Sequence, residues 1–418
     1  MLLENESYPG DCRVLLQAES LTVAGYRVSV ICPTDKKSDR IAETVGDVRV
    51  FRYPHPPHIN GLLGYALEYG YSILMQFLIS LYVFVRYGFD AIHMHTPPDM
   101  NAVIPAFYKV FGKKFVYDLH DLSPELYQAQ RDGEGSKLIH SLLLWFERFA
   151  SRTANVLIAT NETQQNVQIH RSGASPSKCF VVRNGPNEAF MQTVTPKQEL
   201  RKAGCLNIGY VGVIGVQDGV DYLIRAVHVL VTKRRRTDLQ VIIVGSGPAL
   251  ADLRSLVEKL KLSQYFLFTG MVPFVEVPQH IAAFDICSTP DPSNSYNDSC
   301  TTIKTMEYMA IGKPLVCFET SENVKSAGTA ALYASNNDVL EYASLLEKLM
   351  DDAELRTQMG KQGRQRVENG LTWNHQATQL IKAYDGLFGI SRHVDLPCIS
   401  TDSSQVRQQA SNADWVSG

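Results

Sequence analysis

The stretch Asn207-Ile-Gly-Tyr-Val211 runs directly into Gly212-Val-Ile-Gly-Val-Gln-Asp-Gly219, which is followed by Val220-Asp-Tyr-Leu-Ile-Arg-Ala-Val-His-Val-Leu230. The first segment is short and apolar, which indicates a buried strand. The second is a glycine loop, and the third has apolar residues at helical spacing. A strand that leads through a glycine loop into a helix is typical of doubly wound α/β domains.

The same alternation of strand-like and helix-like segments runs through the whole chain. In the second half, further strands are expected at Leu239–Val244, Phe266–Thr269, Asp285–Cys287 and Pro314–Phe318. In the first half they are expected at Arg27–Cys32, Val48–Phe51, Ala91–His95, Lys114–Asp118, Asn155–Ala159 and Cys179–Val182. These strands are nearly all apolar, as in parallel sheets that helices cover on both faces. The sequence therefore predicts an α/β protein with two Rossmann-like, doubly wound parallel-sheet domains.

The length of 418 residues supports this division, because one core rarely serves more than about 250–300 residues. We expect an N-terminal domain at 1–187, a C-terminal domain at 188–370 and a helix at 371–389 that packs back on the N-terminal domain. A disordered tail is expected at 390–418, and the ligand site in the crevice between the domains. Met1-Leu-Leu-Glu4 is short for an opening strand, so either that strand is abbreviated or the reading frame starts elsewhere.

The composition is that of a soluble globular protein, with 45% hydrophobic and 20% charged residues. The net charge of −3 gives no argument for a nucleic-acid partner. None of the eight cysteines forms a Cys-x-x-Cys pair, which suits thiols in a reducing compartment. No secretory signal pattern begins the chain, so a cytoplasmic location is expected.

The stretch with the most chemical content is Asp291-Pro-Ser-Asn-Ser-Tyr-Asn-Asp-Ser-Cys-Thr-Thr-Ile-Lys-Thr-Met-Glu-Tyr-Met-Ala-Ile-Gly-Lys-Pro314. A loop of small polar residues leads into a helix whose free amides and Lys304 suit a phosphate. Glu307 lies one turn further on the same face, where its carboxylate could accept hydrogen bonds from a ribose diol. The alternative is a capped surface helix with an ordinary lysine–glutamate pair.

This segment resembles the nucleotide-binding helix of family-four retaining glycosyltransferases (group 1, GT-B fold), in which Glu-Tyr-Met-Ala-x-Gly-Lys-Pro matches Glu307 to Pro314. The resemblance extends to about Phe388. It includes Tyr8-Pro-Gly-Asp-Cys-Arg-Val14, Val116-Tyr-Asp-Leu-His-Asp-Leu-Ser-Pro-Glu125, Val182-Arg-Asn-Gly-Pro186 and Gly209-Tyr-Val-Gly-Val-Ile-Gly215. Several ordered matches are more specific than any single motif.

The resemblance implies that Glu307 binds the donor ribose and that Lys304 lies near the diphosphate, with the helix N-terminus near Thr301. His120 would reach the donor sugar; the alternative is a structural histidine beside Asp118 and Asp121. Ser299 stands where the family has the first glutamate of its pair, which puts in doubt how the sugar hydroxyls are held. The neighbouring Asp298 or loop amides are the candidates for that task.

A second departure lies in the loop Gly212–Gly219, which includes Gly215. The family usually carries an arginine and a lysine there to hold the diphosphate, whereas this chain has Gln217 and Asp218. The phosphates would then depend on Lys304, backbone amides and helix dipoles. Gly245-Ser-Gly247 is expected to let the backbone approach the nucleotide closely.

No metal or other cofactor is expected. His93-Met-His95 has metal-like spacing, but no third ligand clusters with it in the sequence, so strand-end structure or acceptor contact is preferred. The chain has no Asp-x-Asp triplet, the divalent-cation clamp of the other major glycosyltransferase fold.

The expected activity is transfer of a sugar from a nucleotide-sugar donor to a hydroxyl acceptor, with retention of configuration. A uridine diphosphate donor is preferred, and a guanosine donor stays open. The alternatives are an inactive binding or scaffold relative and a nucleotide-sugar epimerase of the same two-domain type.

The segment Leu62–Val85 carries one charge, Glu68, and is long enough to span a bilayer. Its two glycines, its tyrosines and the apparent fold favour a buried or interfacial helix over a transmembrane one. An interfacial helix would suit a lipid-linked or polysaccharide acceptor in cell-surface glycan assembly, with the enzyme peripheral on the inner face of the plasma membrane.

Overall fold

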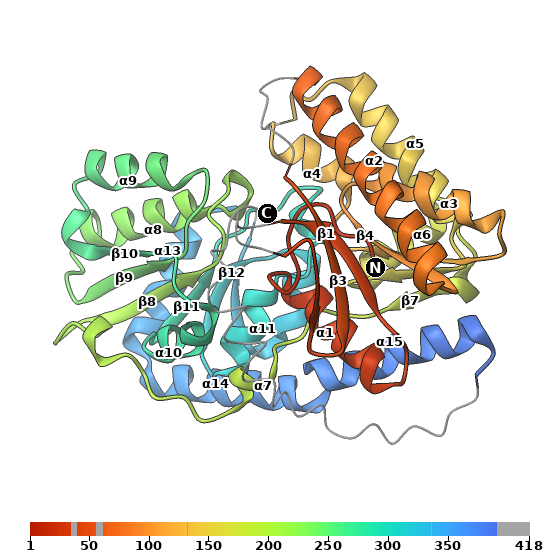
Figure 1. Cartoon of the computed structure of the whole chain (residues 1–418). Coiled ribbons are helices and arrows are strands. Elements are labelled where there is room, and N and C mark those ends of the chain that lie inside the picture. Colours follow the sequence, from red (N-terminus) through yellow and green to blue (C-terminus); the bar gives the residue numbers. More distant parts are fainter. Residues whose placement is uncertain (35–39, 56–61, 132, 336, 391–418) are drawn as a thin grey trace. The chain divides into compact units, whose positions relative to one another are not determined.

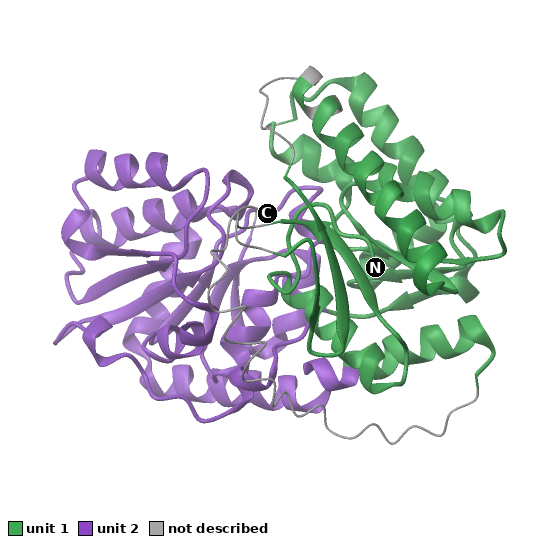
Figure 2. Ribbon diagram, in the orientation of Figure 1, with its two compact units in different colours: residues 1–183, 376–413 green, residues 184–375, 414–418 purple. Residues whose placement is uncertain are grey.

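The computed structural model describes residues 1–34, 40–55, 62–131, 133–335 and 337–390 (Figure 1). The chain forms two compact units (Figure 2). Unit 1 comprises residues 1–183 and the described residues from 376 on, and unit 2 comprises residues 184–375. The tail expected to be disordered lies, from residue 391 on, outside the described residues.

Unit 1 contains two sheet segments joined through Leu2, in which all pairs except β2–β3 are parallel. The strand orders are β1-β3-β2 and β4-β5-β6-β7, and Leu2 forms single bridges to both Ile31 of β1 and Met94 of β4. The strands are β1 (Ser29–Pro33), β2 (Ala42–Val45), β3 (Val48–Tyr53), β4 (Ala91–Thr96), β5 (Lys114–Leu119), β6 (Val156–Ala159) and β7 (Cys179–Val181). The helices include α1 (Cys12–Val23), α2 (Leu62–Tyr87), α3 (Val103–Lys109), α4 (Ser123–Ala129), α5 (Lys137–Thr153), α6 (Glu162–His170) and most of α15 (Trp373–Phe388).

Unit 2 contains one six-stranded parallel sheet of order β10-β9-β8-β11-β12-β13. The strands are β8 (Leu206–Val211), β9 (Leu239–Val244), β10 (Phe266–Gly270), β11 (Ile286–Thr289), β12 (Leu315–Phe318) and β13 (Ala331–Ala334). The main helices are α8 (Val220–Thr232), α9 (Leu250–Lys259), α10 (Val277–Ala282), α11 (Ile303–Ala310), α12 (Ser321–Ala327), α13 (Val339–Asp351) and α14 (Ala353–Arg366). The strand order reverses between β8 and β11, and ligands of such sheets bind outside the carboxyl ends of the strands at that point.

The predicted α/β class and doubly wound parallel sheets are confirmed. Every predicted strand is present, with ends that differ from the prediction by two residues or fewer. Two strands were missed. Strand β13 adds a sixth strand to unit 2, and β2 runs antiparallel to β3 in unit 1, so the expectation of purely parallel pairing was wrong there.

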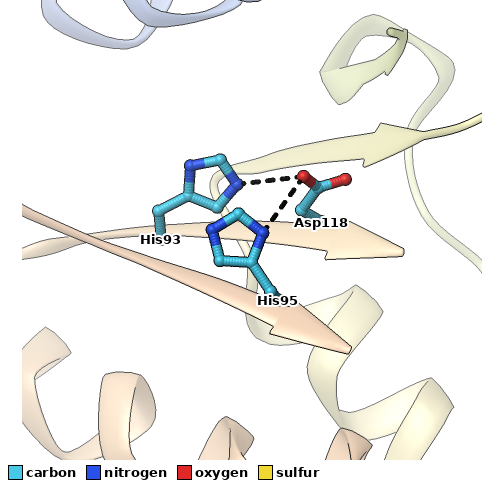
Figure 3. Close-up of side chains that lie close together, drawn as sticks. All are labelled: His93, His95 and Asp118. Atoms are coloured by element: carbon cyan, nitrogen blue, oxygen red, sulfur yellow. Dashed lines mark hydrogen bonds and ion pairs between the residues drawn. The ribbon is translucent and has the colours of Figure 1, made fainter. Parts of the chain in front are cut away.

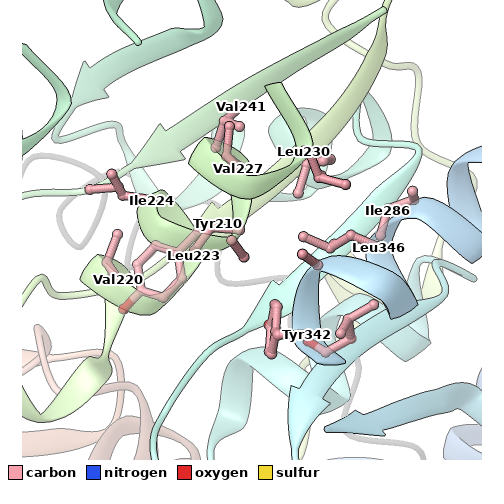
Figure 4. Packing of buried hydrophobic residues seen from close by; sticks show 14 of the residues in the cluster. Tyr210, Val220, Leu223, Ile224, Val227, Leu230, Val241, Ile286, Tyr342 and Leu346 are labelled. Carbon is pink, nitrogen blue, oxygen red and sulfur yellow. Dashed lines mark hydrogen bonds between the residues drawn. The ribbon is translucent and has the colours of Figure 1, made fainter. Parts of the chain in front are cut away.

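The core of unit 2 shows why the opening stretch folds as it does (Figure 4). Helices α8 and α13 pack against each other, and α13 also contacts β11, β12 and β13. Their buried apolar residues belong to one core cluster with residues of β8 and β9. Leu223 and Val227 of α8 and Leu346 of α13 are 0% exposed. Tyr342 of α13 donates its hydroxyl to the backbone oxygen of Val316 in β12 at 2.7 Å, so this buried phenol is satisfied.

Helix α2 turns polar groups toward the protein and apolar groups outward. Gln76 donates hydrogen bonds to the backbone oxygen of Leu3 at 2.9 Å and to the Tyr53 hydroxyl at 3.1 Å, and Ser72 donates to Glu4 at 3.0 Å. Its large apolar side chains that are about half exposed or more are Leu67, Leu74, Leu78, Tyr82 and Val85.

Among the described residues, one helical stretch, Leu67–Tyr87, is long and apolar enough to cross a membrane by length and composition. Core helices of soluble proteins also meet this criterion, but only 22% of its most apolar window is buried. One side of the helix packs against a core cluster of unit 1, so the expectation of a buried or interfacial helix stays a prediction.

Candidate functional site

The loop after β11 and helix α11 form the centre of the candidate site in unit 2. All residues of α11 from Lys304 to Ala310 are buried. Tyr308 anchors the helix, because its hydroxyl accepts a hydrogen bond from the backbone nitrogen of Val211 at 2.8 Å. This contact places α11 beside the carboxyl end of β8, at the point where the strand order reverses.

Lys304 is buried between two carboxylates. Its Nζ donates to Asp291 Oδ1 at 2.9 Å and to Asp218 Oδ1 at 3.1 Å, and it lies 4.8 Å from the centre of the Tyr210 ring. Burial alone would lower the pKa of Lys304, but Asp291, Tyr210 and Asp218 hold that pKa well above its usual value. The cation is therefore retained, and in this state its charge is met by protein carboxylates.

Glu307 is buried without such a partner. Its side chain is 6% exposed, and no group among the described residues donates a hydrogen bond to its carboxylate. Burial raises the pKa of Glu307 to about 8. The Glu307 oxygens are not among the fully buried polar atoms without a partner, so they keep some access to a ligand. A largely buried carboxyl group without protein hydrogen bonds is still costly. A ligand with hydroxyl donors, such as a diol, would supply the missing hydrogen bonds.

The alternative of a capped surface helix with a lysine–glutamate pair is wrong. Lys304 and Glu307 are 7% and 6% exposed. Lys304 pairs with Asp218 and Asp291 instead. Both side chains lie on the helix beside the β8 end, as the sequence suggested, while their roles toward a donor stay predictions.

The glycine loops lie against each other, which explains their composition. A Cβ on Gly245 would stand 1.9 Å from the backbone oxygen of Gly212, and one on Gly247 would stand 2.5 Å from that of Ile214. The Ile214 nitrogen donates to the Ser246 oxygen at 3.0 Å. These glycines thus allow two protein loops to pack backbone to backbone, whereas the sequence suggested close approach to a nucleotide.

Gly215 begins the short turn that positions Asp218. The backbone nitrogen of Gly215 donates to Asp218 Oδ2 at 3.0 Å, and the other oxygen of that carboxylate accepts from Lys304. Asn297 ties this turn to the loop after β11, because its amide donates to the backbone oxygen of Gln217 at 2.9 Å. The two loops that flank the strand reversal are therefore joined by hydrogen bonds.

The other residues predicted to bind the nucleotide-sugar donor form hydrogen bonds within the protein. Ser299 donates its hydroxyl to the backbone oxygen of Tyr296 at 2.7 Å, and Thr301 donates to Glu322 at 3.2 Å. Asp298 accepts from Ser293 through Oδ2 at 3.1 Å, whereas its Oδ1 is buried without a hydrogen bond. Burial raises the pKa of Asp298. Of these residues, Asp298 has the acceptor that a sugar hydroxyl would use.

His120 follows β5 in unit 1 and belongs to a cluster around Asp118 (Figure 3). Figure 3 shows the imidazoles of His93 and His95 directed at the Asp118 carboxylate, with Nε2 of His93 and Nδ1 of His95 at 3.3 Å and 3.4 Å from Oδ2. Nε2 of His120 lies 3.3 Å from the same oxygen. On the other side, Arg13 donates to Asp118 Oδ1 at 2.9 Å.

The electrostatics of this cluster are dominated by Arg13. Burial alone would raise the pKa of Asp118, but Arg13 and His120 hold that pKa well below its usual value. Burial lowers the pKa of His93 and, more strongly, that of His95. Asp118 is therefore held as the carboxylate, with Arg13 as its buried cationic partner.

The cluster corrects one expectation. The sequence suggested that no third ligand accompanies His93 and His95, yet the structure brings Asp118 and His120 to them. The register of the parallel pair β4–β5 is the reason, because His95 stands opposite Asp118. The pairs His-x-His and Asp-x-His on neighbouring strands were the signal that could have revealed this.

Several contacts of the site were not predicted as such. Asp218 and Asp291 both lie in quoted motifs, but only the folded chain shows that they hold Lys304. In unit 1, Gln17 of α1 donates to Asp118 at 2.7 Å. Residues that follow neighbouring strands of one parallel sheet lie at the same edge of that sheet, and this rule could have indicated the contact of Lys304 with the carboxylates.

Two family models match the chain. "Glycosyltransferase Family 4" matches residues 13–190, and "Glycosyl transferases group 1" matches residues 205–352. The 2-deoxystreptamine glucosyltransferase of Streptomyces kanamyceticus is 25% identical over 402 residues, which are 91% of this chain and 99% of that protein. The alpha-D-kanosaminyltransferase of the same organism is 26% identical over 60% of this chain and 64% of its own length.

Solved structures show the same fold at low identity. Sucrose-phosphate synthase from Thermosynechococcus elongatus superposes with a TM-score of 0.76 at 18% identity, covering 93% of this chain and 96% of its own. HepE of Anabaena in complex with UDP-glucose gives 0.67 at 17% identity and 92% and 98% coverage. WaaG, a glycosyltransferase of lipopolysaccharide biosynthesis, gives 0.67 at 17% identity and 93% and 99% coverage.

The relatives named here are glycosyltransferases, so the comparisons support a transferase over the epimerase alternative. The chain belongs to the family-four, group 1 glycosyltransferases and has the GT-B fold.

Proposed function

We propose that this glycosyltransferase takes a sugar from a nucleoside diphosphate donor held by α11 and transfers it, with retention, to a hydroxyl acceptor. The observation that carries the proposal is the buried Glu307 carboxyl, which has no hydrogen-bond donor among the described residues, one helical turn from the buried cation Lys304. A ribose diol would donate hydrogen bonds to the Glu307 carboxylate, and a diphosphate would approach the Lys304 ammonium group.

The reaction breaks the bond between the anomeric carbon and the donor phosphate and forms a bond to the acceptor oxygen, whose proton passes to the departing diphosphate. Negative charge grows on the leaving group, so fixed positive groups near it lower the barrier. Lys304 is the candidate for this role, and it must first exchange a carboxylate partner for a phosphate oxygen. No metal at the diphosphate is part of this proposal. For His120, a contact with the donor sugar stays a proposal drawn from the resemblance.

A uridine diphosphate donor is preferred. It is supported by the likeness in fold to Anabaena HepE, which has been solved with UDP-glucose. A guanosine donor is the alternative, and a direct comparison of nucleotides separates the two.

For the acceptor, we propose a lipid-linked intermediate of cell-surface glycan assembly. The support is the exposed apolar face of α2, next to which Phe107 of α3 packs its ring against Phe77 of α2. An amphipathic helix with such a face suits the membrane interface. Every cysteine in the described part of the chain is free, which agrees with a location in the reducing cytoplasm, on the inner face of the membrane.

The test is binding of UDP and GDP to the full chain and to Glu307→Gln, with Glu354→Gln as the control. Glu354 is an exposed glutamate on α14 of the same unit, so its variant makes the same chemical change on the surface. One nucleotide at a hundred times its Kd is expected to stabilise the wild type by about 2.7 kcal/mol.

Glu307→Gln is expected to lose most of this stabilisation and Glu354→Gln none of it. Folded protein that binds neither nucleotide would contradict the proposal and favour the inactive relative. Equal binding by wild type and Glu307→Gln would remove the assigned role of Glu307.

A further inference from the structure

The cluster around Asp118 in unit 1 has a geometry that the transfer reaction does not explain. One ligand atom from each of His93, His95 and Asp118 lies within 4.8 Å of the other two. His120 joins two of them, with its Nε2 at 3.1 Å from His95 Nδ1 and 3.3 Å from Asp118 Oδ2. Apart from His120, these side chains are almost fully buried.

The distances in the cluster are long for hydrogen bonds and suitable for a shared metal ion. Charge-assisted N–H···O bonds measure about 2.7–2.9 Å. The three imidazole nitrogens stand 3.3 Å, 3.4 Å and 3.3 Å from Asp118 Oδ2. Bonds of about 2.0–2.1 Å to a tetrahedral zinc ion place neighbouring ligand atoms about 3.3–3.4 Å apart.

The number of nitrogens around this oxygen points the same way. Asp118 Oδ2 already accepts a hydrogen bond of 2.7 Å from Gln17. Three imidazole nitrogens in addition exceed what the lone pairs of one carboxylate oxygen can accept. A cation among the imidazoles and the carboxylate would explain why these atoms converge.

The surroundings orient His93 and Asp118 as metal ligands are usually oriented, whereas Nε2 of His95 is buried without a hydrogen bond. Ligating histidines commonly bond a protein group through the second ring nitrogen, and ligating carboxylates are themselves hydrogen-bonded. Nδ1 of His93 lies 2.9 Å from the Tyr384 hydroxyl of α15, and Arg13 donates to Asp118 Oδ1 at 2.9 Å. His93 and Tyr384 also line a cavity of about 470 Å³ in unit 1.

We propose that His93, His95 and Asp118 bind a zinc ion, beside which His120 lies against His95 and Asp118. Imidazole and carboxylate ligands in tetrahedral arrangement suit Zn²⁺ among the common divalent ions. The ion would join the ends of β4 and β5 and fix the ring of His120. Arg13 already offsets the charge of Asp118, so we expect weaker binding than at thiolate sites and removal by a chelator.

The test is the metal content of full-length, tag-free protein from zinc-supplemented culture after dialysis into metal-free buffer. About one zinc per chain is expected. The chelator-treated protein is then loaded with Co²⁺, and an intense visible absorption band typical of tetrahedral Co²⁺ is expected. Neither readout depends on the transfer reaction.

Two variants and a control locate the ion. His95→Gln is expected to abolish the cobalt band. Tyr384→Phe keeps the ring but removes the hydroxyl beside His93, and a zinc affinity about 10- to 100-fold weaker is expected. His170→Gln, at an exposed histidine that ends α6, should leave both readouts unchanged. Thermal unfolding shows whether each variant is folded.

Folded wild-type protein that retains no zinc and shows no cobalt band would overturn the proposal and leave the cluster as a hydrogen-bond network centred on Asp118. Metal binding that neither His95→Gln nor Tyr384→Phe changes would also overturn it, because the ion would then lie elsewhere. If His95→Gln does not fold, Tyr384→Phe alone decides.

Discussion

The folded protein buries the carboxyl group of Glu307, which makes its ionised form unfavourable. Burial raises its pKa from 4.5 to about 8, so the folded chain binds a proton more tightly than the unfolded chain does. Stability linked to this group must therefore fall as the pH rises from about 4.5 to about 8. Such a cost is common at residues that are kept for function.

We predict that Glu307→Gln is more stable than the wild type at neutral pH. The difference should grow with pH across the window from about 4.5 to 8, by up to about 1.4 kcal/mol for each pH unit. Thermal unfolding of both proteins at pH 5.5, 6.5 and 7.5 measures it. A difference that stays constant or shrinks as the pH rises would show that the Glu307 pKa is not raised.

Asp218 lies in the glycine loop after β8, and its carboxylate pairs with Lys304, the cation that a diphosphate would meet under the proposed function. Asp218→Asn keeps an oxygen that can accept from the Gly215 nitrogen. It removes one of the two carboxylate charges beside Lys304. We predict tighter UDP binding, on the order of tenfold, which corresponds to about 1.4 kcal/mol. Calorimetric titration measures the affinity.

The control for this variant is Asp221→Asn, which makes the same charge change at the start of α8, in an exposed pair with Arg225. Its affinity for UDP should be close to that of the wild type. Weaker binding by Asp218→Asn would mean that Asp218 itself contacts the donor or a group bound with it.

At the scale of elements, the strands were predictable and the contacts between loops were not. Parallel strands such as β9 are apolar throughout because helices cover both faces, and this pattern is local in the sequence. Strand β2 has exposed, mixed residues, and the two middle residues of β13 are only partly buried, so neither strand is apolar and buried throughout. The ion pair of Lys304 with Asp218 joins residues 86 positions apart, and no periodicity reports such a distance.

For helix α2, the structure shows which side faces unit 1 and which side is exposed. The hydrogen bonds of Gln76 fix one side of the helix to unit 1, and Leu74 and Leu78 are 54% and 50% exposed on the other. We predict that Leu74→Ser with Leu78→Ser weakens binding to vesicles of anionic phospholipid about tenfold, because apolar area no longer enters the interface. Vesicle co-sedimentation measures the bound fraction.

Leu340→Ser is the matched control for this experiment, since Leu340 is 51% exposed on α13 of unit 2. Its vesicle binding should equal that of the wild type. A double variant of α2 that binds vesicles as well as the wild type does would separate this helix from the membrane. Wild-type protein that only detergent releases from membranes would favour the transmembrane alternative.

At the scale of the whole molecule, the chain divides the work between two units with separate cores. The residues assigned to the nucleotide, including Lys304, Glu307 and Asp218, all belong to residues 184–375. The buried core of that unit is drawn from the same range. Unit 1 by contrast needs the end of the chain, because Tyr384 of α15 packs edge-on against Tyr26, and Asp385 accepts a hydrogen bond from the Tyr26 hydroxyl at 2.8 Å.

This division leads us to predict that a fragment of residues 184–375 folds alone and binds the donor nucleotide. A single continuous segment with its own sheet and core meets the requirements of an autonomous domain. The fragment should unfold in one cooperative transition, and UDP should raise its Tm, with the shift lost in Glu307→Gln. A chain cut after residue 375 should instead lose stability in unit 1, since it lacks the Tyr384 and Asp385 contacts. A folded fragment without a nucleotide shift would mean that unit 2 does not suffice for donor binding, and would place part of the nucleotide site in unit 1.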